Sequence, residues 1–268
     1  MRWKDFKERA LTFSYDDGEI SDRKLVQLFN KYGFKGTFNL CKGFIGREGC
    51  LCEDEVATLF EGAGHEVAIH GACHYSLDEI ANALVIDEVL TDRKYFEKLL
   101  GHTVTGMAYA CGSYSQRVMS LVEACGIQYS RTIKESYDFG IPKRWTEWNA
   151  TCFHKSEKLA EIIDKFISDR KGDCFHLPPL LLNIWGHSNE LEQDNSWNII
   201  DELGEKLGNR SDIWYATNGQ ICEYCKAFDS LIFSADGCMV KNPSAIDLYI
   251  SYFGKNYIIP SGQTIDLR

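Results

Sequence analysis

The chain has 268 residues, 44% of them hydrophobic, and its formal net charge at pH 7 is −10. This length and apolar content allow one large domain with a buried core, which excludes disorder as the default state. No basic cluster stands out and no apolar run approaches the length of a membrane span, so we expect neither nucleic acid nor a membrane as a partner.

The first half of the chain alternates between strand-like and helix-like segments. A strand at residues 10–15 ends at two aspartates, and the helix that follows, at 21–32, begins at the N-cap Ser21 and ends at Gly33. Further elements are predicted in the same way. They are strands at 37–40, 66–69, 106–110 and 128–133 and helices at 53–62, 77–100 and 116–125.

The second half begins with an aromatic, irregular stretch at residues 134–155 and then resumes the alternation. Helices are predicted at 156–169, 197–207 and 220–228, and strands at 180–185 and 213–216. This order predicts a (β/α) barrel of parallel strands over residues 1–228, with its site at the C-terminal rim. Short strand-like pieces and turns follow, so we read residues 229–268 as a small β appendage.

The 11 cysteines are scattered without the regular spacing of a disulfide scaffold, and the first nine residues are charged rather than signal-like. Reduced thiols in the cytoplasm are the simplest interpretation. Cys222 and Cys225 form a CxxC without a second such pair, and a pair of thiols in a helix is expected there rather than a zinc knuckle.

Two adjacent carboxylates, Asp16 and Asp17, close the first strand. Because they repel each other, a site that keeps them together holds a cation or gives them different roles, although an exposed turn would be favoured for the pair alone. His70 and His74 follow the third strand, and two histidines four residues apart share one side of a helical turn. With a carboxylate such as Asp17 they would form a two-histidine-one-aspartate metal set.

At these positions the sequence resembles the polysaccharide deacetylases of the NodB-homology, carbohydrate esterase type. Their Thr-Phe-Asp-Asp-Gly motif is matched by Thr12-Phe13 and Asp16-Asp17-Gly18 with Ser14-Tyr15 inserted. Their His-Ser/Thr-x-x-His motif corresponds to residues 70–74, with Gly71 in place of the hydroxyl residue. Thr37 to Leu40 resembles the second strand, and Leu182 to His187 approximates the Leu-x-His motif. The resemblance covers about residues 10–228 and implies a distorted (β/α) barrel of the polysaccharide deacetylase type.

The resemblance also implies a role for each matched residue. Asp17, His70 and His74 would bind a divalent metal, with zinc expected and cobalt, nickel or manganese as alternatives. That metal would polarise the acetyl carbonyl and lower the pKa of bound water to about 7. Asp16 would be the general base, and His187 would protonate the leaving amine or alkoxide.

The chain departs from the family at two motifs. The third motif, Arg-x-Pro-Tyr-Gly, reads Ala108-Tyr109-Ala110-Cys111-Gly112, so its arginine is missing. The backbone N–H of Cys111 can still supply the oxyanion contact, and Arg131 is predicted to replace the lost charge. For the fourth motif, Asp138, Trp145 and Trp148 lie in the right region without the right spacing.

The predicted function is that of a cytoplasmic, metal-dependent polysaccharide or oligosaccharide deacetylase, acting on an N- or O-linked acetyl group. A small intracellular oligosaccharide is favoured over a cell-wall polymer. One alternative is hydrolysis of a non-sugar amide. Another is a non-catalytic carbohydrate-binding protein, which the missing arginine favours and the presence of Asp16 and His187 opposes. No partner arrangement is visible in the sequence for the remaining histidines, His65, His102, His154 and His176.

Overall fold

The structure is a computed structural model that describes residues 1–168 and 177–268, so His176 and the expected helix end at Asp169 lie outside the described residues. A nine-stranded parallel sheet forms its centre. Its strands are β1 (Arg9–Asp16), β2 (Gly36–Leu40), β3 (Glu66–Ile69), β4 (Gly106–Ala108), β5 (Tyr129–Glu135), β6 (Trp148–Ala150), β7 (Cys152–Phe153), β8 (Leu180–Gly186) and β9 (Ile213–Tyr215). Their order is β6-β5-β4-β3-β2-β1-β8-β7, with β9 paired to β1.

The sheet curls into a nearly closed barrel through a short segment that the sequence did not reveal. Strands β6 and β7 are separated only by Thr151; β6 pairs with β5, and β7 pairs with β8. The stretch at 134–155, predicted to be irregular, therefore joins the two ends of the sheet. Strands of two and three residues are too short to show a periodicity of their own. The predicted (β/α) barrel is confirmed.

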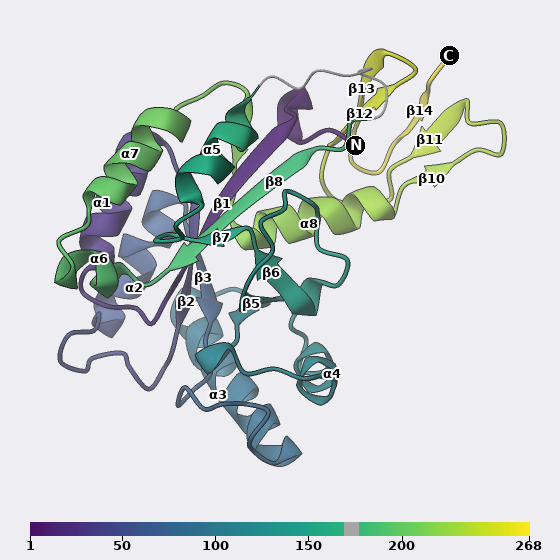
Figure 1. Cartoon of the computed structure of the whole chain (residues 1–268). Coiled ribbons are helices and arrows are strands. Elements are labelled where there is room, and N and C mark those ends of the chain that lie inside the picture. The colour runs from purple at the N-terminus through teal and green to yellow at the C-terminus, as the bar shows by residue number, and fades with distance from the viewer. Residues whose placement is uncertain (169–176) are drawn as a thin grey trace.

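Helices surround the strands (Figure 1). They are α1 (Asp22–Tyr32), α2 (Glu53–Leu59), α3 (Asn82–Leu100), α4 (Gln116–Ala124), α5 (Leu159–Ile167), α6 (Ser188–Gln193), α7 (Asn198–Leu207) and α8 (Asn218–Asp229), with 3-10 turns at Lys4–Phe6, Glu61–Ala63, Ala110–Gly112 and Trp145–Glu147. The helix predicted from residue 77 begins only at Asn82, so that expected start was wrong. Ser21 is the N-cap residue of α1, as predicted, but its side chain makes no capping hydrogen bond, and its hydroxyl lies 2.8 Å from that of Ser188. Among the described helices, none combines the length and the apolar character needed to cross a lipid bilayer.

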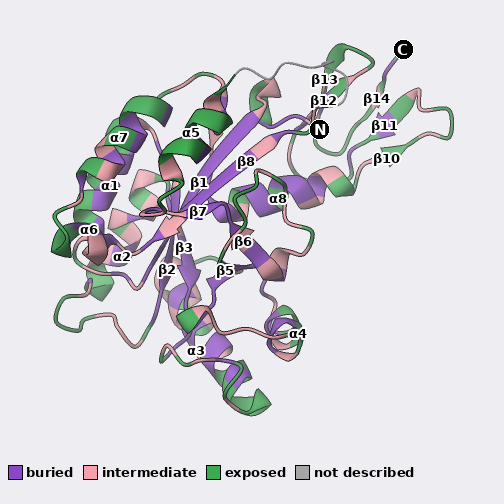
Figure 2. Ribbon diagram, viewed as in Figure 1, coloured by how far each residue is buried: buried purple, intermediate pink, exposed green. Residues whose placement is uncertain are grey.

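Strand β1 shows how the barrel separates apolar from polar side chains. All of its residues are buried (Figure 2). Leu11, Phe13 and Tyr15 belong to the hydrophobic cluster that joins the strands to the helices, and the ring of Phe13 lies 4.6 Å from that of Phe29. Successive strand residues face opposite sides. Thr12, Ser14 and Asp16 therefore face a polar barrel interior.

The N-terminal end of the barrel is closed by the start of α8. The backbone N–H of Asn218 donates to Thr37 Oγ1 at 2.8 Å, and that of Gly219 donates to Glu66 Oε2 at 2.8 Å. Glu66 also accepts hydrogen bonds from the hydroxyls of Thr37 and Tyr129, at 2.8 and 2.9 Å. A carboxylate at a helix N-terminus is favoured by the helix dipole. This polar plug leaves the C-terminal rim as the open end.

Beyond α8 the chain forms two small antiparallel sheets. One contains β10 (Ile232–Phe233), β11 (Met239–Lys241) and β14 (Thr264–Asp266), and the other contains β12 (Leu248–Tyr252) and β13 (Lys255–Ile259). Their buried side chains join a second hydrophobic cluster with Trp3 and Tyr224. The division into domains at residues 228 and 229 stays a prediction.

Candidate active site

The two aspartates lie at the C-terminal end of β1, as the sequence predicted. Strand β1 pairs with β8 in unbroken register from Arg9 to Tyr15, so the strand reaches the aspartates without a bulge. Asp17 then turns the chain with a φ of +80°, a left-handed value that is uncommon outside glycine.

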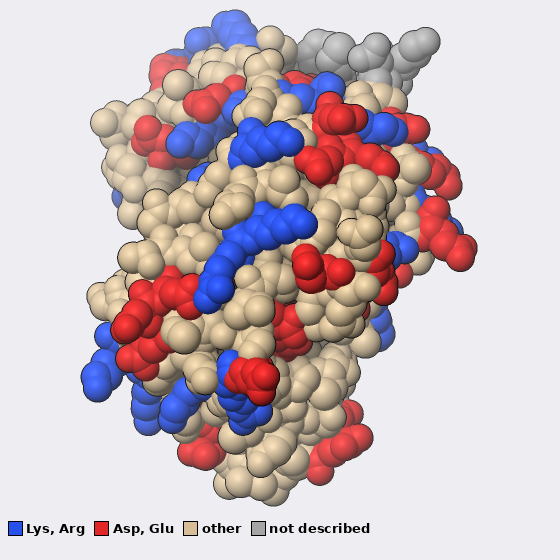
Figure 3. Space-filling model, turned by 90° about the vertical axis from the view of Figure 1, so that its left-hand side faces the viewer, with Lys and Arg blue, Asp and Glu red and all other residues tan. Residues whose placement is uncertain are grey.

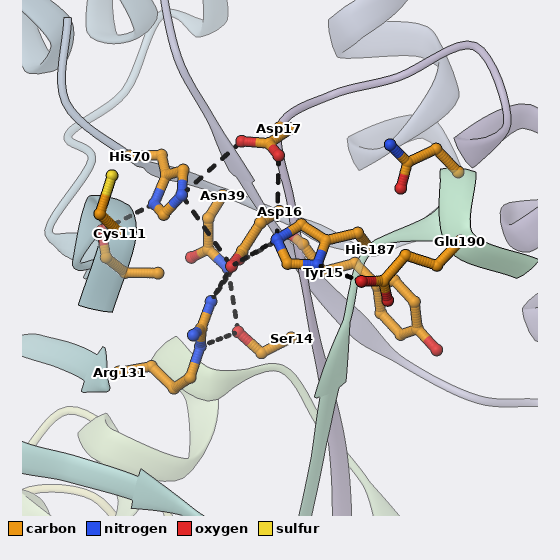
Figure 4. Close-up of polar contacts among 12 residues, drawn as sticks. Ser14, Tyr15, Asp16, Asp17, Asn39, His70, Cys111, Arg131, His187 and Glu190 are labelled. Atoms are coloured by element: carbon orange, nitrogen blue, oxygen red, sulfur yellow. Dashed lines mark hydrogen bonds and ion pairs between the residues drawn. The ribbon is translucent and has the colours of Figure 1, made fainter. Parts of the chain in front are cut away.

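Asp16 is buried and held from two sides. Its Oδ1 accepts a hydrogen bond from Asn39 Nδ2 at 2.9 Å, and both of its oxygens contact the fully buried guanidinium of Arg131. Burial by itself would raise the pKa of Asp16, but Arg131, assisted by His70 and His187, brings that pKa below its ordinary value. The side chain is therefore a carboxylate. The structure places Arg131 against it, as the sequence predicted (Figure 4).

Asp17, His70 and His74 form a cluster in which one ligand atom from each lies within 4.8 Å of the others. The Nε2 atoms of His70 and His74 are 3.7 and 3.6 Å from Asp17 Oδ1. Two ligands of one tetrahedral ion, each about 2 Å from it, are about 3.3 Å apart. Within the described residues, the buried Asp17 Oδ1 has no hydrogen-bond partner. This donor set, with its unpaired oxygen, fits a divalent ion.

A loop rather than a helical turn brings the two histidines together, so the expected turn was wrong. Gly71 and His74 have φ values of +91° and +60°, and the two imidazole rings meet edge to face with centroids 4.9 Å apart. A residue with a side chain would be strained at the φ of Gly71. The loop in this chain therefore favours glycine at position 71.

Two acidic residues of α3 support this loop, and the sequence analysis missed both. Asp92 accepts hydrogen bonds from the backbone N–H groups of Lys42 and His70, at 2.7 and 3.1 Å, and Glu88 accepts one from that of Cys73 at 2.8 Å. Burial raises the pKa of Asp92 to about 7 in spite of these bonds. The available signal was that the two acids, four residues apart, share the buried face of a predicted helix.

The ring of His70 has a defined orientation. Its Nδ1 lies 2.9 Å from the carbonyl oxygen of Ala108, which can only accept. Nδ1 therefore carries the proton, and the lone pair of Nε2 faces Asp17. A backbone carbonyl in this position fixes the tautomer that a metal ligand needs.

His187 approaches the aspartates from the side opposite His70 (Figure 4). Its Nε2 lies 3.9 Å from Asp16 Oδ2 and 3.8 Å from Asp17 Oδ2, and its Nδ1 lies 3.5 Å from Glu190 Oε1. Burial lowers the pKa of His187, but Glu190 and the two aspartates outweigh it and raise the pKa to about 9. His187 is therefore protonated at neutral pH. The sequence analysis missed Glu190, although its position three residues after His187 was a usable signal.

The remaining predicted residues divide into two groups. Cys111 lies at the rim in a 3-10 turn with a φ of +56°, and its Sγ is 3.8 Å from His74 Nδ1. The fourth-motif candidates lie elsewhere. Trp148 is buried against Trp145 and Tyr129, and Asp138 is exposed and accepts a hydrogen bond from the N–H of Phe139. None of their contacts in the described chain is with the aspartates or histidines of the site.

The surface is mixed in charge on the face that Figure 3 shows, where lysines and arginines lie among aspartates and glutamates. A nucleic-acid-binding face would instead carry a continuous basic stripe. The expectation that nucleic acid is not a partner stays a prediction.

Comparison with known proteins identifies the family that this chain resembles. Residues 4–130 match the family model described as polysaccharide deacetylase, which confirms the resemblance predicted from the sequence. No curated protein sequence matches the chain significantly.

Solved structures share the fold. A putative polysaccharide deacetylase from Mycobacterium smegmatis is 16% identical with a TM-score of 0.57, over 85% of this chain and 94% of that one. The Xyl-CE4 domain of a multidomain xylanase from the hindgut metagenome of Trinervitermes trinervoides is 13% identical with a TM-score of 0.54, over 82% and 92%. Puue allantoinase is 13% identical with a TM-score of 0.63, over 82% and 91%.

Two further matches cover only about half of the solved chain. The match covers 55% of the length of a Streptococcus pyogenes deacetylase and 44% of that of a Bacillus cereus polysaccharide deacetylase.

Proposed function

Because residues 4–130 match the polysaccharide deacetylase family and the fold is its (β/α) barrel, we propose that this protein is a metal-dependent hydrolase that removes an acetyl group from a carbohydrate. The proposal covers both N- and O-linked acetyl groups, since both present a carbonyl carbon open to attack by water. One observation carries the proposal: an ionised Asp16 lies between the Asp17–His70–His74 cluster and a protonated His187.

Asp17, His70 and His74 hold the metal in this proposal, and zinc suits a set of one carboxylate and two imidazoles. When bound, such an ion polarises the acetyl carbonyl and makes water at the site more acidic. Asp17 is free to serve as a ligand because its Oδ1 has no hydrogen-bond partner in the described chain.

Asp16 is the general base. Arg131 and Asn39 fix the orientation of its carboxylate, and Arg131 keeps the pKa of Asp16 low after burial has raised it. Asp16 accepts the proton of the attacking water as the new carbon–oxygen bond forms. Arg131 thus replaces the arginine that is missing from the third motif.

His187 is the general acid and Cys111 supplies an oxyanion contact. The backbone N–H of Cys111 stabilises the charge that develops on the carbonyl oxygen. Because Glu190 and the aspartates raise the pKa of His187 to about 9, its Nε2 carries a proton at neutral pH. His187 donates this proton to the leaving nitrogen or oxygen as the bond to the acetyl carbon breaks.

The substrate we propose is a small oligosaccharide in the reducing environment of the cytoplasm. The cysteines of the described residues are all free thiols, and this supports a reducing compartment. The second candidate is hydrolysis of a non-sugar amide, since the same residues can act on a C–N bond outside a sugar and the barrel occurs in an allantoinase as well as in deacetylases.

The first experiment measures metal content by elemental analysis for the wild type beside His74→Ala and Asp16→Asn. We expect about one divalent ion per chain, lost in His74→Ala and kept in Asp16→Asn. Acetate release is then followed with N- and O-acetylated oligosaccharides and with acylated non-sugar amines. Asp16→Asn should lower turnover about 10²- to 10⁴-fold, while Asp138→Asn, at an exposed position outside the site, should not.

Each outcome has a consequence for the proposal. A wild type that takes up no ion after soaking with zinc would favour a non-catalytic carbohydrate-binding protein. Turnover of the acylated amines alone would establish the second candidate. Full activity in Asp16→Asn would remove the role given to that residue.

A further inference from the structure

Three side chains from three different elements form a hydrogen-bonded chain behind His187. Glu190 Oε2 lies 3.0 Å from His154 Nε2, and His154 Nδ1 lies 2.9 Å from the hydroxyl of Tyr15. Glu190 is on α6, His154 directly follows β7, and Tyr15 is on β1, next to Asp16. His154 and Tyr15 are buried, with 0% and 1% exposure, whereas the Glu190 side chain is 35% exposed.

The chemistry of the groups fixes the direction of these hydrogen bonds. The two histidines lower the pKa of Glu190 although burial opposes this, so its carboxylate is ionised and can only accept. His154 Nε2 therefore donates to Glu190. Burial lowers the pKa of His154, and its neutral ring has no proton left for Nδ1. Nδ1 accepts, and the donor is the O–H of Tyr15.

The packing around His154 is specific to this ring. A Cβ added at Gly186 of β8 would lie 2.3 Å from His154 Nδ1, so β8 leaves space for the imidazole only because it carries a glycine there. Lys155 Nζ also donates to the backbone oxygen of Glu190 at 2.9 Å, which ties the same segment to the six-residue helix α6. The buried imidazole thus gives a partly exposed carboxylate on a short helix one fixed position.

We propose that Tyr15 and His154 are positioning residues that orient the imidazole of His187 through Glu190. This inference rests on the proposed function, in which His187 is the general acid. Glu190 Oε1 lies 3.5 Å from His187 Nδ1, at ion-pair distance but without hydrogen-bond geometry in the described chain. In this proposal its negative charge favours a proton on that nitrogen. The proton that His187 gives up is then the one on Nε2, which faces the two aspartates.

The test is a double-mutant cycle on acetate release. His154→Phe keeps the ring volume and removes both hydrogen bonds, and we expect it to lower kcat about 10- to 100-fold with little change in KM. His154→Gln can both donate and accept, and it should recover part of the loss. In a His187→Ala background, His154→Phe should cause no further loss, because its effect passes through His187. His102→Phe, at an exposed histidine that also contacts a glutamate, is the matched control.

Substrates with different leaving groups distinguish the loss of a proton donor from general destabilisation, which would slow the hydrolysis of all of them. An aryl acetate such as 4-nitrophenyl acetate has a leaving group that needs no proton, so His154→Phe and His187→Ala should both retain its hydrolysis. Two outcomes would overturn the proposal. One is that His154→Phe lowers the hydrolysis of aryl acetate and of acetylated sugar equally. The other is that His154→Phe lowers kcat as much in the His187→Ala background as in the wild type.

A second measurement does not depend on activity. Nitrogen-15 NMR spectra of histidine-labelled protein should show His154 protonated on Nε2 alone and His187 protonated on Nδ1, with the His187 signals shifted in Tyr15→Phe and His154→Gln. A His154 protonated on Nδ1, or His187 signals unchanged in both variants, would overturn the proposal. If the wild type released acetate from no compound, the proposed function would fail. These spectra would still show whether Tyr15 and His154 orient His187.

Discussion

The two ends of the barrel each place a carboxyl group among interior polar groups, and the pKa values of the two groups shift in opposite directions. Asp16 at the C-terminal rim contacts the guanidinium of Arg131, and its pKa is lowered although burial opposes this. Glu66 at the N-terminal end accepts hydrogen bonds from three neutral donors, and burial raises its pKa. Hydrogen bonds from neutral donors therefore do not fully offset the effect of burial on the pKa of Glu66. A general base inside this barrel needs a buried cation beside it.

The two ends also differ in shape. A cavity of about 810 Å³ lies at the N-terminal end, with Glu66 and Tyr129 among its lining residues, whereas the candidate catalytic groups gather at the other end. At the rim, Asp17, His74 and Cys111 have positive φ values, as six other non-glycine residues of the described chain do elsewhere. Such conformations persist only where the surrounding structure holds them, and they are concentrated at functional sites.

The largest expected effect comes from removing the guanidinium of Arg131 at the C-terminal rim. Arg131→Met leaves Asp16 as an unpaired buried charge, so we expect the free energy of unfolding to fall by about 3–5 kcal/mol and turnover to be lost. Urea unfolding at pH 7 measures the first effect. The double variant Arg131→Met/Asp16→Asn should recover part of the stability. Arg23→Met, which breaks an exposed pair with Glu55, is the control and should change the stability little. Unchanged turnover in Arg131→Met would contradict the role of Arg131.

The next largest effect is expected where Asp92 supports the loop that carries His70 and His74. Asp92→Ala leaves the backbone N–H groups of Lys42 and His70 without their carboxylate, and we expect unfolding to become easier by about 2–4 kcal/mol. Metal affinity should fall about 10- to 100-fold, measured by competition with a chelator. Asp87→Ala, at an exposed position of the same helix, is the control. Equal affinities in the two variants would show that Asp92 does not support the site.

At the opposite end, His65 should make the fold sensitive to acid. Burial lowers the pKa of His65 to about 4, and its Nδ1 accepts a hydrogen bond from the N–H of Gly36 at 3.1 Å. The unfolded state, with a pKa of about 6.5, takes up the proton first, so stability is lost as the pH falls from about 7 towards 4. At about 1.4 kcal/mol per pKa unit, the loss at pH 5 is about 2 kcal/mol. Urea unfolding at pH 7.5 and 5 should show this loss of stability in the wild type. A similar loss in His65→Gln would mean that another titrating group causes it.

The smallest effect is expected at Glu66. Because its pKa is raised in the folded state, its stabilising contribution is complete below the unfolded pKa of about 4.5 and declines as the pH rises through the folded value. Glu66→Gln does not titrate, so the variant should gain stability relative to the wild type as the pH rises, by about 1 kcal/mol or less. Urea unfolding at pH 4.5 and 8 measures the difference. A relative gain on acidification instead would mean that Glu66 is stabilised as a carboxylate, like Asp16.

The sequence by itself determined the barrel and the position of most candidate site residues. Strand and helix periodicities are local, and they predicted the alternation on which the fold rests. Parallel strands end at the same rim, so residues directly after strands, such as Asp17, His70 and His187, could be expected to meet there. Cys111 was placed by its motif position alone.

Only the tertiary structure decided which groups surround these residues. Arg131 was proposed from the sequence to replace a charge, but its contact with Asp16 depends on which face of β5 it occupies and on the curvature of the sheet. The spacing of Glu88 and Asp92 indicated only a shared helix face, and His154 gave no local signal, because the partners of these residues lie 15 to 139 residues away. The loop at residues 71–81 and the closing strands β6 and β7 were missed for the same reason. Their conformations are set by hydrogen bonds to residues distant in the sequence, which local periodicity does not encode.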